Sequence, residues 1–257
     1  WTHSVDNTEI KWLVALLLAA AAAALAWYFW DDVSPPAPAP IQQQAPAADA
    51  EPAEPVHPIE PLSVTPGEGE LVELPPLGES DSYFALALLD IFGADLEPLL
   101  ADEALIDKSV ATVDNLTRSR VAEKIRPLGR LPGNFVVVAE GDNGPFYLSP
   151  DNYARYDSLV NMVTGADADE LEATYRRFYP LMQEAFAQLG YPDSYFNDRV
   201  IAVIDHLLAT PEPEQPIRLA QPHVLYEFAD PALEALSGGQ KLLIRMGPDH
   251  AARIKAL

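Results

Sequence analysis

Acidic and imidazole side chains in one stretch of the chain are the first candidates for catalytic chemistry. Asp198 and Asp205 stand seven residues apart, so a helix would place both carboxylates on one face, as the acid pair of a glycosidase requires. His206 adds an imidazole that can transfer protons near neutral pH. These three residues suggest a hydrolase. Acids two turns apart are also common on solvated helix faces, and we favour that second interpretation.

Tyrosine and arginine side chains gather in two short segments, 152–157 and 191–199. Arginine flanked by tyrosine rings is typical of binding hot spots. The structural alternative is a buried Arg155–Asp157 pair packed by the rings. The candidate binding residues are Tyr153, Arg155, Tyr156, Asp157, Tyr191, Tyr195, Asn197, Asp198 and Arg199.

A third motif has the letters of a nucleotide-binding signature. Residues 236–240 read Leu-Ser-Gly-Gly-Gln, as in ATP-binding-cassette ATPases, but the chain has no GxxxxGK[S/T] loop to hold phosphates. We therefore expect no nucleotide and interpret the glycines as a helix C-cap, with Gly238 or Gly239 left-handed. Cysteine is absent and no histidines have HxxxH spacing, so we predict neither a metal nor a cofactor.

The candidate residues lie on predicted helices. From Gly78 onward apolar residues recur at helical spacing, which predicts a mainly helical domain over 78–257 with minor β-hairpin elements. Pro180 is expected to kink or split its helix, and 82–92 is apolar nearly all round and expected to be buried. The predicted helices cover 82–92, 95–100, 101–126, 153–163, 169–189, 195–208, 231–236 and 248–257. A hairpin is predicted at 135–139 and 146–148, and extended segments at 217–219 and 224–228.

Residues 12–30 contain no charged side chain and end in aromatic residues, among them Trp27, Tyr28 and Trp30. A helix of this length crosses a hydrocarbon core of about 30 Å, and such rings suit the membrane interface. We predict a single-pass transmembrane helix over 12–30. The alternative is a signal peptide cleaved after Ala24-Leu25-Ala26, but its leader would be acidic instead of basic.

Charge sets the predicted orientation. Lys11 precedes the span, whereas residues 31–107 contain seventeen acidic side chains and no lysine or arginine. The positive-inside rule then places the tail 1–11 in the cytoplasm and the domain in the periplasm, with the span in a bacterial inner membrane. A net charge of −23 repels phosphate backbones, so we do not expect a nucleic-acid partner.

Proline dominates the segment after the span. Residues 34–76 hold twelve of the 25 prolines, interspersed with alanine and acidic residues. Proline interrupts helices and sheets, and the carboxylates repel one another, so we predict a disordered linker over 31–77. We interpret it as a passive spacer in preference to a ligand for a proline-recognising groove.

A family resemblance rests on segments 113–116, 152–157, 189–192, 195–199, 204–211 and 226–248. Together they resemble domain of unknown function family 3014 of proteobacteria, over residues 74–257. The resemblance implies a single-span protein with a proline-rich spacer. It carries over no activity, cofactor or catalytic residue, and it makes 236–240 part of the family's own motif.

The leading hypothesis is a membrane-anchored cell-envelope interaction or accessory module. Its helical domain would bind an unknown protein or envelope polymer through the tyrosine- and arginine-rich residues, with the tether raising the local concentration. The alternatives are an envelope hydrolase that uses Asp198, Asp205 or His206, and a small-ligand sensor. We favour binding over catalysis.

Overall fold

The computed structural model describes residues 54–59, 73–129, 131–141 and 144–257. The predicted tail 1–11 and transmembrane helix 12–30 lie outside these residues, as does most of the predicted linker 31–77. Within the described ranges, no helix combines the length and the apolar character needed to cross a bilayer.

The described chain is made up of helices and short strands. The α-helices are α2 (Asp81–Phe92), α3 (Leu105–Asn115), α4 (Asp157–Thr164), α5 (Ala168–Gln188), α6 (Phe196–Leu208), α7 (Pro231–Glu234), α8 (Gly238–Met246) and α9 (Pro248–Lys255). The 3-10 helices are η2 (Leu77–Glu79), η3 (Ala94–Leu99), η4 (Glu123–Ile125) and η5 (Pro150–Tyr156). The strands are β1 (Val137–Ala139), β2 (Phe146–Leu148), β3 (Arg218–Ala220) and β4 (Glu227–Phe228).

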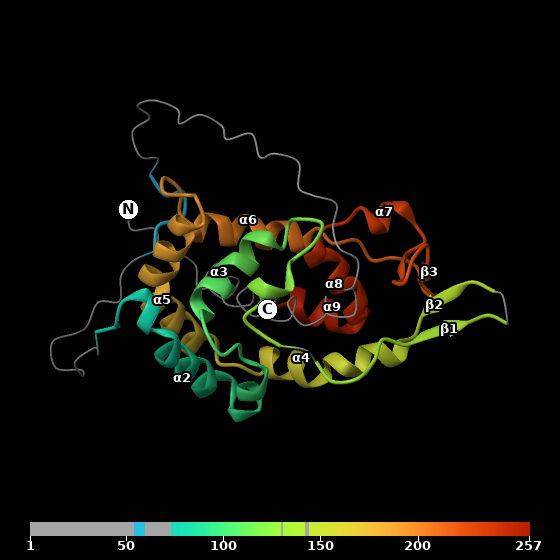
Figure 1. Cartoon of the computed structure of the whole chain (residues 1–257), viewed down its shortest axis with the longest axis horizontal. Helices are drawn as coiled ribbons and strands as arrows, with labels where there is room; N and C mark the ends of the chain where they lie inside the picture. Colours follow the sequence, from blue (N-terminus) through green and yellow to red (C-terminus); the bar gives the residue numbers. More distant parts are fainter. Residues whose placement is uncertain (1–53, 60–72, 130, 142–143) are drawn as a thin grey trace.

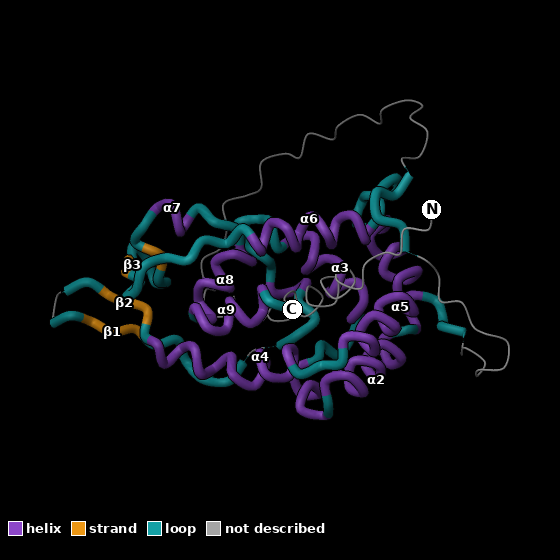
Figure 2. Tube along the Cα trace, turned by 180° about the vertical axis from the view of Figure 1, so that it is seen from behind, coloured by secondary structure: helices purple, strands orange, loops and turns teal. Residues whose placement is uncertain are grey.

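The fold is mainly helical, as predicted, with a small sheet at one end (Figure 1). Helix α3 lies centrally and packs against α2, α5 and α6, while α8 packs against α9 and η5. Viewed from behind, the helices again form one body, and the strands lie together at its far end (Figure 2). One apolar core runs through the helical body, and a smaller one joins the sheet to Ile244 of α8.

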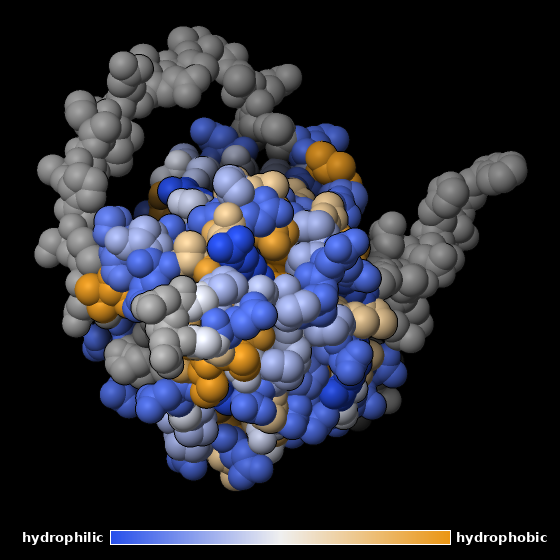
Figure 3. Space-filling model, turned by 90° about the vertical axis from the view of Figure 1, so that its right-hand side faces the viewer, coloured by the Kyte–Doolittle hydropathy of each residue, from blue (hydrophilic) through white to orange (hydrophobic). Residues whose placement is uncertain are grey.

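The predicted hairpin is confirmed and extended. Strands β1 and β2 pair antiparallel with Val137 opposite Leu148, and β3 and β4 continue the sheet in the order β1-β2-β3-β4. Strand β1 is therefore an edge, and Val138 on it is half-exposed. Figure 3 views this end of the molecule and shows small apolar patches separated by hydrophilic side chains.

The predicted helix over 101–126 is wrong, because α3 spans only Leu105–Asn115. The chain leaves the helix so that two of its carbonyl oxygens can accept hydrogen bonds from a distant segment. Leu116 O accepts from Gly239 N at 3.0 Å, and Arg118 O accepts from Gly238 N at 2.7 Å. The start of α3 is fixed by another long-range contact, since the Asp81 carboxylate accepts from Ala104 N and Leu105 N.

Two further expectations about the helices need correction. Helix α5 runs unbroken through Pro180, so the proposed split is wrong. Helix α2 is not buried all round: Leu86 is 61% exposed, whereas Phe84 and Phe92 face the core. Similarly, Leu208 at the end of α6 is half-exposed, while Val203 and Leu207 point inward.

The Leu-Ser-Gly-Gly-Gln segment begins a helix, so its interpretation as a C-cap is wrong. Ser237 is the N-cap of α8, and its hydroxyl accepts from Gln240 N while the Gln240 side chain accepts from Ser237 N. This reciprocal pair is a capping box. Gly238 and Gly239 form the first turn, which lies against Leu116 and Arg118. Neither glycine has a left-handed backbone, and close approach accounts for Gly239.

We expect Gly239→Ala to lower the free energy of unfolding by about 1–3 kcal/mol. A Cβ atom at Gly239 would stand 2.6 Å from Cδ2 of Leu207 and 3.0 Å from Leu116 O. Gly78→Ala is the control, because no atom lies within 4 Å of its added Cβ. Urea denaturation of both variants measures the difference. Equal stabilities would contradict the close packing of α8 on α3.

Candidate functional site

The nine predicted binding residues fall in two separate places. Tyr153, Arg155, Tyr156 and Asp157 lie on η5 and the start of α4, beside α8 and α9. The other five lie in the loop before α6 and in its first turn. The structure therefore does not bring the nine into one surface, and each group must be considered by itself.

The side chains of the first group attach η5 to the rest of the domain. Tyr153 covers Gly247, where an added Cβ would stand 2.7 Å from the ring, and its hydroxyl donates to Oε1 of Gln215 at 3.3 Å. Arg155 donates from Nε to Pro132 O at 3.2 Å. Tyr156 is fully buried, and burial raises its pKa to about 12, so the phenol stays neutral at physiological pH.

Asp157 has a partner on α9. Its Oδ1 lies 2.9 Å from Nε2 of His250, whose Nδ1 lies 2.9 Å from Met246 O. The contact joins the start of α4 to the last helix. The side chains around Arg155 thus make several contacts within the fold. The structural alternative considered from the sequence, a buried Arg155–Asp157 pair, is wrong in its burial, because Asp157 is exposed and lies against His250.

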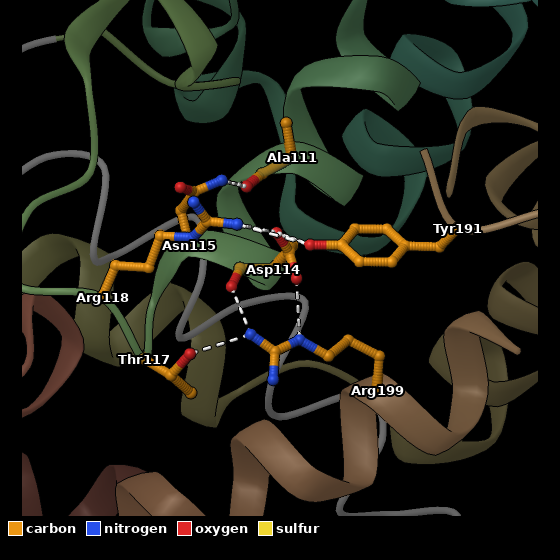
Figure 4. A network of polar contacts seen from close by, with 7 residues as sticks. All are labelled: Ala111, Asp114, Asn115, Thr117, Arg118, Tyr191 and Arg199. Carbon is orange, nitrogen blue, oxygen red and sulfur yellow. Dashed lines mark hydrogen bonds and ion pairs between the residues drawn. The ribbon is translucent and has the colours of Figure 1, made fainter. Parts of the chain in front are cut away.

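Tyr191 and Arg199 of the second group belong to a polar network around a buried carboxylate (Figure 4). Arg199 Nε contacts Oδ1 of Asp114 at 2.8 Å, and its Nη2 donates to Asp114 O and to the Thr117 hydroxyl. Arg118 reaches Oδ2 of Asp114 at 3.2 Å. The Tyr191 hydroxyl lies beside this pair, 3.4 Å from Nη2 of Arg118 and 3.5 Å from Oδ2 of Asp114. This network fastens α6 to the end of α3.

Asn197 and Asp198 bind a segment that lies about 140 residues earlier in the chain. The Asp198 carboxylate accepts two consecutive backbone N–H groups, from Val56 to Oδ2 at 3.0 Å and from His57 to Oδ1 at 2.7 Å. The Asn197 amide donates from Nδ2 to His57 O at 2.8 Å. Two side chains on one helical turn therefore satisfy three backbone groups of a segment that bends at Val56 and His57.

Helix α5 orients these two side chains. The buried Tyr175 hydroxyl donates to Oδ1 of Asn197 at 3.0 Å, which leaves Nδ2 directed at His57. Gln183 accepts from Phe196 N at 2.8 Å through Oε1 and donates to Ser194 O at 2.8 Å. The side-chain oxygen of Gln183 thus caps the first N–H group of α6. Burial raises the pKa of Tyr175, which keeps this donor protonated.

The residues of the hydrolase hypothesis have different neighbours. Asp198 contacts the 54–59 segment, whereas Asp205 is exposed two turns along α6. His206 Nε2 lies 2.8 Å from the Ser237 hydroxyl at the α8 cap. Desolvation, with a smaller contribution from Arg199, lowers the pKa of His206. Among the described residues, no three histidine or acidic side chains are grouped to hold a metal ion.

Sequence reasoning selected Asn197, Asp198 and Arg199 but missed their partners. Asp114 lies inside a segment that the family resemblance had marked, yet its burial depends on the fold of α3 against α6. Gln183 carries no local signal, because it acts on a helix thirteen residues later. Residues 54–59 were assigned to the linker on their proline content.

The comparisons with known proteins identify a family but no function. A family model described as "Protein of unknown function (DUF3014)" matches residues 105–257, more than half of the chain. This range contains α3 to α9, and hence every residue of the Asp114 network and of the Asn197–Asp198 pair. No curated protein and no solved structure gives a significant match.

We expect Arg199→Ala to lower the free energy of unfolding by about 2–4 kcal/mol, because it leaves the Asp114 carboxylate buried with a poorer partner. Arg118→Ala is the matched control: it removes a guanidinium from the same carboxylate, but its side chain is 57% exposed. We expect a cost below about 1 kcal/mol for that change. Thermal and urea unfolding measure both. An equal loss of unfolding free energy in the two variants would contradict the conclusion that Arg199 is the main partner of the Asp114 carboxylate.

The lowered pKa of His206 makes stability depend on pH in a defined direction. The unfolded chain, with a histidine pKa of about 6.5, binds more protons than the folded chain, so stability falls as pH drops through that value. We expect His206→Gln to flatten the fall in unfolding free energy between about pH 7.5 and 5.5. His223→Gln, on an exposed loop, should leave the slope as it is. An unchanged slope in His206→Gln would refute the prediction.

Proposed function

The chain belongs to the family described as protein of unknown function (DUF3014), and from that premise we propose that it is a tethered interaction module. Its first α6 turn captures a proline-flanked peptide segment that bends at the bound residues, and residues 54–59 are the resident occupant. The membrane span at 12–30 and the periplasmic position of the domain are part of the same proposal, as inferred from charge and hydropathy.

The observation that carries the proposal is the contact of Asp198 with two consecutive backbone N–H groups. Hydrogen bonds to a charged acceptor are stronger than those between neutral groups, contributing about 1.5–3 kcal/mol each. Backbone groups are common to all peptides, so this contact recognises a main chain whatever its side chains. The chain bends at Val56 and His57, which lets both N–H groups reach the same carboxylate. Asn197 adds a donor for the carbonyl group that follows them, that of His57.

The exposure of the segment alternates along the chain, although its backbone bends at Val56 and His57. Pro55, His57 and Ile59 are half-buried against the domain, whereas Glu54, Val56 and Pro58 are exposed. Ile59 packs against the main apolar core. The side chains that contact the domain are therefore those of every second residue, Pro55, His57 and Ile59. Ile59 supplies the apolar contact after the two hydrogen-bonded residues.

The prolines restrict the peptide before it binds. Pro55 and Pro58 flank the pair of donors, and proline holds the chain near the extended polyproline conformation. Less conformational entropy is then lost on binding, as in other proline-rich ligands. A partner with the same pattern would compete with 54–59, which has the advantage of being attached to the domain.

We expect the site to bind a separate peptide once its own segment is released. In the full-length chain, Val56→Pro with His57→Pro removes both N–H donors. A labelled peptide of residues 53–62 should then bind, as measured by fluorescence polarisation. Binding to the wild-type chain should be at least about tenfold weaker, because the attached segment competes.

The control for this experiment is the second acid of the same helix. Adding Asp198→Ala to the released chain should abolish binding, whereas adding Asp205→Ala, which removes an exposed carboxylate two turns away, should not. Equal binding with and without Asp198 would refute the proposed function. If the peptide does not bind the released chain, the contact between Asp198 and residues 56–57 has only a structural role.

A further inference from the structure

The segment bound by Asp198 belongs to a repeat of three residues. Residues 51–62 read Glu-Pro-Ala, Glu-Pro-Val, His-Pro-Ile and Glu-Pro-Leu. Each triplet has proline at its second position and an aliphatic residue at its third. The first position is glutamate in every triplet except the one that begins with His57. The repeat therefore offers the site several similar stretches of chain, of which it holds one.

The backbone groups that the site binds recur along this repeat. Proline has no N–H group, so two consecutive donors always come from the third residue of one triplet and the first residue of the next. The bound donors are Val56 and His57, and the apolar contact follows at Ile59. A shift of three residues toward the carboxyl terminus would present the donors of residues 59–60 and the side chain of Leu62 instead.

The conformational limits of the backbone recur as well. Proline has a fixed φ, and the residue before a proline is held away from the helical region, so two of the three residues in each triplet are restricted. Val56 is the remaining residue of its triplet, and the chain bends at Val56 and His57. Because every triplet is built in this way, neither hydrogen bonding nor backbone freedom explains why the site holds 56–57.

Charge at the first position of the triplet does distinguish the registers. The backbone nitrogen of His57 lies 2.7 Å from Oδ1 of Asp198. The His57 side chain branches from the next atom and is half-buried, so it lies close to this carboxylate. A shift of three residues in either direction would put Glu54 or Glu60 in its place. Two carboxylates repel each other there, whereas histidine is neutral or positive.

We propose that His57 is the residue that determines which stretch of the repeat is bound. The site selects, among triplets of the form x-Pro-aliphatic, the one whose first residue bears no negative charge. This inference rests on the proposed function and names its ligand class. A partner peptide would carry an aliphatic residue, then a neutral or basic residue, then proline and a second aliphatic residue, as in Val56 to Ile59.

The test moves the histidine by one triplet in the full-length chain. His57→Glu combined with Glu60→His exchanges the two side chains, and amide hydrogen exchange is measured residue by residue. We expect exchange at least about tenfold faster at position 56 and at least about tenfold slower at position 59 than in the wild-type chain, because the bound register shifts by three residues. Adding Asp198→Ala should abolish the new protection. Protection that stays at 56–57, or that vanishes without appearing at 59–60, would overturn the proposal.

His57→Gln is the matched control, because it removes the imidazole without adding a charge. It should keep the exchange rates at 56 and 57 within about twofold of the wild-type values. Loss of protection in this variant as large as in His57→Glu would overturn the proposal, because charge would not be the property that the site reads.

Peptide binding separates this inference from the proposed function. The peptide 53–62 with His57→Glu should bind the chain that carries Val56→Pro and His57→Pro at least about fivefold more weakly than the unaltered peptide, whereas the His57→Gln peptide should bind within about twofold of it. Equal binding of the three peptides would overturn the role of His57 and leave the proposed function standing. Binding of none would count against the proposed function, and the exchange measurement would then decide the role of His57 by itself.

Discussion

The ion pair between Asp114 and Arg199 is the contact on which the arrangement of this domain depends. It joins the end of α3 to the first turn of α6, and it lies beside the point where Leu116 and Arg118 receive the start of α8. A buried carboxylate is costly unless it is fully paired, which explains why several donors converge on Asp114. Helix α6 is thereby held against α3, while Asn197 and Asp198 on its first turn contact α5 and residues 56–57.

Because α6 is held in place, the polar side chains beside it can be kept in one orientation. Tyr175 and Gln183 of α5 fix the Asn197 amide and the first N–H of α6, so the pair at 197–198 is oriented before any peptide arrives. A similar contact occurs elsewhere in the domain: the Asp81 carboxylate accepts hydrogen bonds from two consecutive N–H groups at the start of α3. On α6 the accepted groups belong to a segment outside the matched family region, which makes exchange with another peptide a reasonable function.

The elements that follow from local pattern could be predicted, and those set by distant contacts could not. The apolar stripe through Tyr175, Phe178 and Met182 gave α5, and the Gly141–Gly144 turn gave the hairpin. The end of α3 could not be foreseen, because it depends on N–H groups of Gly238 and Gly239 more than 120 residues later. Asn197 and Asp198 stood out for their residue types, but their ligand did not: the alternating exposure of 54–59 exists only once the segment lies against α6.

The most direct test of the central claim is amide hydrogen exchange at Val56 and His57 in the full-length chain. Exchange requires the hydrogen bond to open, so an amide bound to a carboxylate is protected. If Asp198 captures the segment, both amides exchange slowly in the wild-type chain and in Asp205→Ala, and rapidly in Asp198→Ala. Fast exchange in the wild-type chain, or protection that survives the loss of Asp198, would contradict the account.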